Sequence, residues 1–167
     1  QFEYIRKSVL AFNLPSVDLV NYEADDLIAT YVDQILRKGA KVTIVSSDKD
    51  LMQLFKKGVR IFDPMKNKFI SEEDVQNKFG VIPSKVIDVQ ALAGDSSDNV
   101  PGVPGIGVKT AAELINKYGN LESLLKSANE IKQNKRRETL LTNKDKAIIS
   151  KQLVTLKHDA PVDRDLT

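Results

Sequence analysis

The stretch GDSSDNVPGVPGIGVKTAAELI, residues 94–115, decides how the fold of this chain is interpreted. Its first half is a long run of turn-forming residues that carries two carboxylates, Asp95 and Asp98, and its second half leads into a helical pattern. Loops of this length inside a compact domain usually have a function. We therefore predict an α/β core with a parallel-type sheet in residues 1–93, followed by a helical subdomain in residues 94–167.

The glycines of this stretch indicate a phosphate-binding hairpin. Residues 105–111, GIGVKTA, fit the helix-hairpin-helix pattern GhGxxxA, in which h is apolar. Glycine lets the backbone approach a phosphate, and the helix that begins near Val108 directs free N–H groups and its positive end toward it. A simple tight turn would also contain GxG, but the complete run favours phosphate binding. The predicted DNA-binding residues are Gly102, Gly105, Ile106, Gly107, Val108, Lys109 and Thr110.

Two other glycine-rich phosphate sites do not fit. The P-loop pattern GxxxxGK[ST] is absent from the chain. A dinucleotide-binding turn would follow a strand, whereas this GxG follows a loop.

Seven carboxylates form three short clusters before and within the loop. They are Glu23, Asp25 and Asp26 in YEADD, Asp48 and Asp50 in SSDKD, and Asp95 and Asp98 in GDSSDN. Each cluster alone has a plain structural explanation, either a helix dipole, a helix cap or a turn. Together, in a chain with no cysteine and one histidine, they predict oxygen coordination of Mg²⁺ or Mn²⁺. Two such ions support hydrolysis of a phosphodiester.

Hydrophobic periodicity predicts alternating helices and strands, and then helices only. The run VTIV, residues 42–45, reads as a strand buried on both faces of a parallel sheet. Ser71 and Asp74 predict a capping box that opens a helix. Helices are expected at 2–12, 23–38, from 71, at 83–93, 109–118, 121–127 and 135–157, the last broken near 142–143; strands at 41–46, 59–62 and 68–70; a helical turn at 51–55; and an extended piece at 17–20.

Composition limits the class of protein. With 167 residues, 41% of them hydrophobic, the chain is long enough for one compact domain. No run approaches the roughly 18 apolar residues of a membrane span, so we expect a soluble, cytoplasmic protein. We also expect it to be a monomer. Acids exceed bases in residues 1–100 and bases exceed acids in residues 101–167. That asymmetry is typical of a cation site beside a surface that binds a polyanion, although a solvated surface of mixed charge also explains it.

The three motifs resemble, in order, the 5′ nuclease domain of bacterial DNA polymerase I, a relative of the flap endonucleases. The resemblance rests on YEADDLIAT, SSDKDLMQL and residues 94–115, and it covers nearly the whole chain. It implies a PIN-like 5′ nuclease fold that removes 5′ flaps and RNA primers in replication and repair. It further implies 5′-flap, nicked or primer-containing duplex DNA as partner, a polymerase domain in the parent chain, a setting near the bacterial nucleoid, and K⁺ at the hairpin carbonyls.

The same resemblance divides the carboxylates between two metal ions. It assigns Glu23, Asp25, Asp26 and Asp48 to the first site. It assigns Asp50, Asp95 and Asp98 to the second, with Asp48 near both.

Relative to this family, the chain is expected to lack the N-terminal third. That segment would contribute two further carboxylates, two strands and a basic arch. We therefore expect the first metal site to be weakened more than the second, and activity to be residual or to depend on the missing segment.

Two other hypotheses stay open. The chain is alternatively a non-catalytic module that binds duplex DNA through its helix-hairpin-helix. A third interpretation is a structural or protein-interaction fragment that associates through an open sheet edge.

Overall fold

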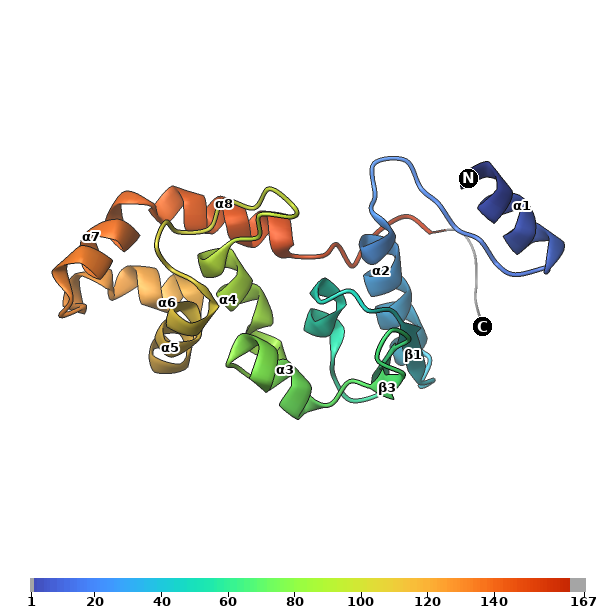
Figure 1. The fold of residues 1–167 in the computed structure, drawn as a ribbon, viewed down its shortest axis with the longest axis horizontal. Coiled ribbons are helices and arrows are strands. Elements are labelled where there is room, and N and C mark those ends of the chain that lie inside the picture. Colours follow the sequence, from blue (N-terminus) through green and yellow to red (C-terminus); the bar gives the residue numbers. More distant parts are fainter. Residues whose placement is uncertain (1, 163–167) are drawn as a thin grey trace.

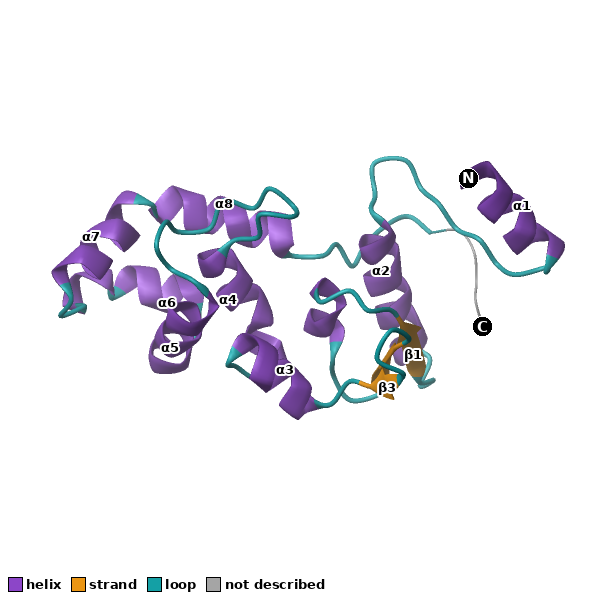
Figure 2. Cartoon of the chain, in the orientation of Figure 1, coloured by secondary structure: helices purple, strands orange, loops and turns teal. Residues whose placement is uncertain are grey.

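Residues 2–162 are described by the structure, a computed structural model of the chain. A small sheet with its flanking helix forms one region, and a group of helices forms the other (Figure 1). Strands occupy only a small part of the chain, and helices and loops make up the remainder (Figure 2). The order, an α/β region followed by helices, is the one predicted.

The sheet has three strands in the order β1-β2-β3. β1 (Val42–Val45) pairs in parallel with β2 (Val59–Asp63), which pairs antiparallel with β3 (Lys68–Phe69). The prediction that VTIV is buried on both faces is wrong, because Ile44 is buried whereas Thr43 and Val45 are exposed. Side chains alternate along a strand, and only the face with Ile44 joins the apolar core.

Helix α2 (Ala24–Arg37) packs against β1 and brings the first acidic cluster to the sheet. Of the apolar stripe that the sequence predicts on this helix, Leu27 and Tyr31 are buried, Ile28 and Ile35 are half-buried and Ala24 is exposed. The helix begins one residue later than predicted, so that Glu23 is its N-cap, and Gly39 follows its end with a φ of 79°.

The remaining elements lie close to the predicted ranges, except for the short 3₁₀ helix at residues 128–130, which was not predicted from the sequence. They are α1 (Phe2–Ala11), η1 (Asp50–Leu54), α3 (Glu72–Phe79), η2 (Pro83–Lys85), α4 (Val86–Ala93), α5 (Val108–Tyr118), α6 (Leu121–Lys126), η3 (Ala128–Glu130), α7 (Asn134–Thr142) and α8 (Lys144–Val154). Ser71 and Asp74 form the predicted capping box before α3. The predicted break near 142–143 occurs at Asn143, but α8 ends three residues before the predicted end at Lys157. Residues 17–20 form no strand.

Helix α1 forms as predicted but buries none of its residues. Its apolar side chains, among them Phe2 and Ile5, are exposed. In Figure 1 the helix stands apart from the other elements. Within residues 2–162, no helix is long and apolar enough to cross a membrane.

Helix α4 is the centre of the core. Val86, Val89 and Leu92 are fully buried, and α5 and α8 pack against this helix. The same apolar cluster continues to the sheet, so that the two regions share one core. Helix α4 precedes the boundary predicted after residue 93, yet it packs with helices that follow that boundary. The division into two domains therefore stays a prediction.

Residues 155–162, which we call the return segment, connect α8 back to α2 (Figure 1). The backbone N–H of Lys157 donates to Asp26 Oδ1 at 2.8 Å, and that of Ala160 donates to Thr30 Oγ1 at 3.1 Å. Gln53 of η1 adds bonds to the carbonyl of Val154 and the N–H of Leu156. The return segment therefore joins the helical region to the helix that carries the first acids.

The loop after α4 is closed by two glycines whose backbones cross. Gly94 and Gly102 have φ values of 72° and 58°, and a Cβ at Gly102 would lie 2.5 Å from the Gly94 nitrogen. Asp95 and Val100 exchange two backbone hydrogen bonds, of 2.8 and 3.0 Å. The Gly102 N–H donates to Ser150 Oγ of α8 at 2.9 Å. The loop is thus fixed at both ends, and its carboxylates lie in between.

Gly102→Ala is expected to destabilise the protein strongly. Left-handed strain and overpacking each cost about 1–3 kcal/mol, so we expect a loss of about 3 kcal/mol or more in the free energy of unfolding. Gly107 is the matched control, because its φ is −89° and no atom lies within 4 Å of an added Cβ. Gly107→Ala should cost about 1 kcal/mol or less. Urea denaturation of both variants measures the difference, and equal losses would contradict the crossing.

Candidate metal centre

Six of the seven predicted carboxylates line one cavity of about 350 Å³. They come from three parts of the chain that the fold brings together: the start of α2, the turn after β1 and the loop after α4. The six are Glu23, Asp25, Asp48, Asp50, Asp95 and Asp98. Gln90 and the apolar residues Val100, Leu153, Val154 and Leu156 complete the wall.

The seventh carboxylate, Asp26, is not part of the cavity lining. It is 8% exposed, and its two oxygens accept backbone N–H groups of Glu23 and Lys157. Both oxygens therefore hold the start of α2 and the return segment in place. Its spacing from Glu23, at i and i+3, fits a capping box as well as a metal ligand, and the sequence alone did not distinguish the two.

The turn after β1 places Asp48 and Asp50 by local hydrogen bonds. The Asp48 N–H donates to Ser46 Oγ at 3.0 Å, and the Asp50 N–H donates to Asp48 Oδ1 at 2.9 Å. Asp50 then begins η1, whose residues Leu51 and Leu54 are buried. The two carboxylates lie at the carboxyl end of a parallel strand, the edge where open α/β sheets bind ligands.

Three carboxylates approach one another closely enough to share a cation. One oxygen from each of Asp50, Asp95 and Asp98 lies within 4.8 Å of the others. Asp95 is oriented by its own loop, since its Oδ1 accepts the N–H of Ser97 at 3.0 Å. These three residues coincide with the set predicted for the second ion.

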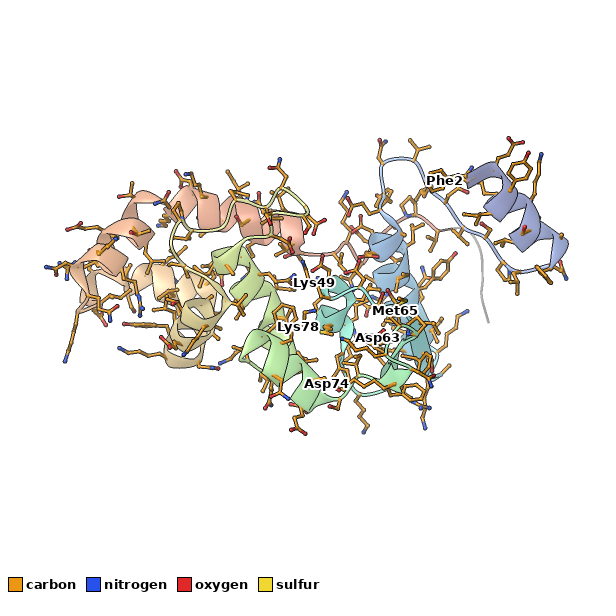
Figure 3. All side chains as sticks on the ribbon, in the orientation of Figure 1. Phe2, Lys49, Asp63, Met65, Asp74 and Lys78 are labelled. Atoms are coloured by element: carbon orange, nitrogen blue, oxygen red, sulfur yellow. The ribbon has the colours of Figure 1, made fainter. Side chains whose placement is uncertain are left out.

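Lys49 supplies a positive charge beside these acids. Its ammonium pairs with Asp95 Oδ2, and it lies in the turn before η1, between α2 and α4 (Figure 3). This hydrogen bond lowers the pKa of Asp95 and raises the pKa of Lys49. The lysine thus neutralises one carboxylate of the cavity.

The other acids repel one another. Burial, reinforced by the charges of Asp48, Asp50, Glu23 and Asp26, raises the pKa of Asp25 to about 6. Burial also raises the pKa of Asp50, against the hydrogen bond from Gln90, which lowers it. Crowded carboxylates with raised pKa values are typical of a site that is completed by a cation.

The donor set fits Mg²⁺ or Mn²⁺ and excludes several alternatives. The ionisable side chains in the cavity lining are six carboxylates, the ligands that these hard ions prefer. The chain has no cysteine, and its one histidine, His158, is bonded to Asp33 of α2 at 2.8 Å. A thiolate or imidazole site is therefore absent from this cavity.

The predicted hairpin exposes part of its backbone. Gly105, Gly107 and Lys109 are exposed at the turn before α5, whereas Ile106 is 5% exposed and packs in the core. Gly102 is buried against Gly94, so its place is structural. The exposed glycines and the N-terminus of α5 leave backbone N–H groups accessible, as phosphate binding requires.

Basic side chains at the start of α7 lie beside the hairpin. Pro104, Gly105 and Ile106 share a cavity of about 480 Å³ with residues around the start of α7. The α7 residues include Lys135 and Arg136, which belong to the basic sequence KRR at 135–137. Backbone donors and cationic side chains thus converge on one surface.

Sequence reasoning did not identify Gln90 as part of the cavity. In the sequence, Gln90 is a single amide within the apolar helical segment VIDVQALA, residues 86–93. A single polar residue forms no repeating pattern that would predict which face of the helix it occupies. Only the packing of α4 against η1 shows that the side chain reaches the acids.

Comparison with known families matches the whole chain. The family model for the 5′-3′ exonuclease N-terminal resolvase-like domain matches residues 1–80. The model for the 5′-3′ exonuclease C-terminal SAM fold matches residues 81–167.

Sequence relatives are considerably longer than this chain. DNA polymerase I of Rhizobium leguminosarum is 57% identical over 166 residues, which are 99% of this chain and 16% of the relative. A 5′-3′ exonuclease of Aquifex aeolicus is 39% identical over 163 residues, 98% of this chain and 55% of the relative. The chain therefore spans less than a fifth of the first and about half of the second.

Solved structures show the fold. The 5′-exonuclease of bacteriophage T5 with bound zinc has a TM-score of 0.84 and 25% identity, over 92% of this chain and 58% of that one. The catalytic core of Rad2 in complex with a DNA substrate has a TM-score of 0.59 and 17% identity, over 95% and 56%. The predicted PIN-like 5′ nuclease fold is confirmed.

The raised pKa of Asp25 predicts how stability depends on pH when divalent ions are removed by a chelator. In the folded protein this carboxyl binds its proton with a pKa of about 6, against an ordinary value of 3.8. Between these values the folded state holds more protons than the unfolded state, so the free energy of unfolding should fall as pH rises from 4 to 7. Denaturant titrations at several pH values measure this slope.

Asp25→Asn is the matched variant for this slope. It cannot ionise, so its stability should fall less over the same pH interval than that of the original chain. Carboxyls with lowered pKa values, such as Asp95, titrate below this interval and contribute equally to both proteins. Identical slopes in the two proteins would rule out a raised pKa at Asp25.

Proposed function

Because this chain belongs to the 5′-3′ exonuclease family, we propose that its carboxylate cavity is a two-metal centre that hydrolyses phosphodiesters at 5′ flaps. One observation carries the proposal. Six carboxylates from three separate segments line one cavity, where burial and mutual repulsion disfavour their ionised forms and a bound cation would stabilise them. RNA primers and nicked duplexes are the related substrates that the family resemblance implies.

The residues divide into two groups around the cavity. Asp50, Asp95 and Asp98 would hold one Mg²⁺ or Mn²⁺, supported by the approach of their oxygens. Glu23, Asp25 and Asp48 line the remainder of the wall and would hold the second. When bound, such ions activate water and stabilise the charge that develops on a phosphodiester.

Other side chains of the cavity would control its electrostatics. Lys49 neutralises Asp95 and keeps a positive charge at the edge of the acids. The apolar residues Val100 and Leu156 are buried in the wall and reduce the local dielectric, which strengthens each charge interaction. This environment favours a doubly charged ion over solvating water.

The hairpin would hold the duplex next to the cavity. Exposed backbone at Gly105 and Gly107 and the N-terminus of α5 suit one phosphate, with Lys109 beside it. Lys135 and Arg136 extend the basic surface along the backbone. The family resemblance adds K⁺ at the hairpin carbonyls. Contacts to phosphates hold the duplex without recognising its bases.

The wider setting follows from the relatives that are fused to a polymerase. We propose that the chain acts as a monomer on replication and repair intermediates near the bacterial nucleoid, in the cytoplasm. A polymerase domain in the same parent protein would extend or replace the strand that the nuclease removes.

Loss of one carboxylate is expected to impair cleavage of a 5′-flap duplex. Asp98→Asn should reduce the Mn²⁺-dependent rate at least roughly 100-fold, equivalent to about 2.7 kcal/mol of transition-state stabilisation. Asp145→Asn is the matched control, because this exposed acid lies in the first turn of α8 and outside the cavity. Release of labelled 5′ products measures the rate. Equal rates for both variants would contradict the assignment.

The hairpin surface predicts the salt dependence of DNA binding. Lys109→Ala combined with Lys135→Ala should weaken duplex binding and reduce the slope of log K against log salt by about 2. Lys57→Ala, at an exposed position before β2, should leave the slope nearly unchanged. Fluorescence anisotropy in a chelator separates this binding from catalysis.

Two outcomes distinguish the catalytic proposal from its alternative. Duplex binding that depends on the hairpin, without cleavage in any divalent ion, would favour the non-catalytic DNA-binding module. If the double lysine variant binds DNA as the original chain does, the hairpin surface is wrong under either hypothesis.

A further inference from the structure

One buried side chain in the wall of the cavity is neither acidic nor apolar. Gln90 is 4% exposed on α4, where Val89 and Ala91 on either side are fully buried. It lines the carboxylate cavity together with the six acids. An amide in the centre of the core is unusual, because burial of a polar group lowers stability unless that group is bonded.

The amide makes one hydrogen bond to a predicted ligand. Its Nε2 donates to Asp50 Oδ1 at 2.5 Å. Its Oε1 is buried and has no partner among residues 2–162. A methionine or leucine would fill a similar volume without an unsatisfied oxygen, so packing alone does not account for a glutamine here.

The hydrogen bond between Gln90 and Asp50 joins α4 to η1, two elements that both contribute to the cavity. Asp50 is the first residue of η1, and its N–H is held by Asp48 Oδ1. Gln90 donates to the side-chain carboxylate of Asp50. Gln90 belongs to α4, the helix that leads into the loop of Asp95 and Asp98. The carboxylate of Asp50 is therefore fixed relative to both partners with which its oxygens converge.

We propose that Gln90 is a positioning residue that orients the Asp50 carboxylate toward the ion shared with Asp95 and Asp98. The inference rests on the proposed function, since it requires a cation at that triad. Loss of a partner that orients a metal ligand typically lowers metal affinity roughly 10–100-fold. Gln90 acts through Asp50 and contacts neither the substrate nor the ion.

The test uses the whole chain, with Mn²⁺ alone as the probe in a calorimetric titration. Gln90→Met removes the donor and keeps the length of the side chain. We expect it to weaken Mn²⁺ binding roughly tenfold or more. Duplex binding in a chelator should stay unchanged, because the hairpin does not depend on this bond.

Gln53→Met is the matched control. Gln53 also bonds through its amide, donating to the Val154 carbonyl and accepting from the Leu156 N–H, and neither bond is to an acid. Its loss should reduce the thermal stability without a tenfold effect on Mn²⁺ affinity. If Gln53→Met weakens Mn²⁺ binding as much as Gln90→Met does, the effect is general destabilisation and the inference fails.

A double-variant cycle tests whether Gln90 acts through Asp50. In an Asp50→Asn background, Gln90→Met should cause little further loss of Mn²⁺ affinity. Additive losses would overturn the inference. If Gln90→Met does not fold, Gln90→Asn serves instead, since it keeps the amide but is one methylene too short to reach Asp50.

Mn²⁺ binding by the original chain distinguishes failure of the proposed metal centre from failure of the role assigned to Gln90. If the original chain binds no Mn²⁺ at millimolar concentration, the metal centre itself is wrong and the inference fails with it. If the original chain binds Mn²⁺ and folded Gln90→Met binds it equally well, only the role of Gln90 is overturned.

Discussion

Mutual repulsion among six carboxylates is the constraint on which the organisation of this structure depends. No single segment brings the acids together; α2, the turn after β1 and the loop after α4 each contribute two. Among residues 2–162, Lys49 is the one cationic side chain that pairs with an acid of the cavity lining. Backbone contacts, more than opposite charges, therefore hold the three acidic segments in place. Burial, together with the remaining repulsion from the neighbouring acids, raises the pKa of Asp25 to about 6.

The core explains why these anchors hold. Helix α4 is buried on nearly all sides and leads directly into the loop, whose ends are fixed by the crossing of Gly94 and Gly102. The return segment bonds back to Asp26 and Thr30, so that α2 is tied to the helical region. The carboxylate cavity and the hairpin are therefore attached to one continuous apolar core.

Much of this arrangement follows from residue pattern, and the exceptions have physical causes. The helix periods, the capping box at Ser71 and the break at Asn143 are local, so the sequence predicts them well. Burial of a strand depends on what packs on each face, which VTIV does not encode. The roles of Asp26 and Gln90 depend on partners 131 and 40 residues away, Lys157 and Asp50, and no local spacing reveals such contacts.

The most direct test of the metal centre is anomalous scattering from crystals of the chain grown with Mn²⁺. The account predicts a peak within about 2–2.5 Å of oxygens from Asp50, Asp95 and Asp98, the range of coordination by oxygen ligands. A second peak near Glu23, Asp25 and Asp48 would correspond to the other ion. Absence of any peak in the carboxylate cavity at millimolar Mn²⁺ would contradict the central claim.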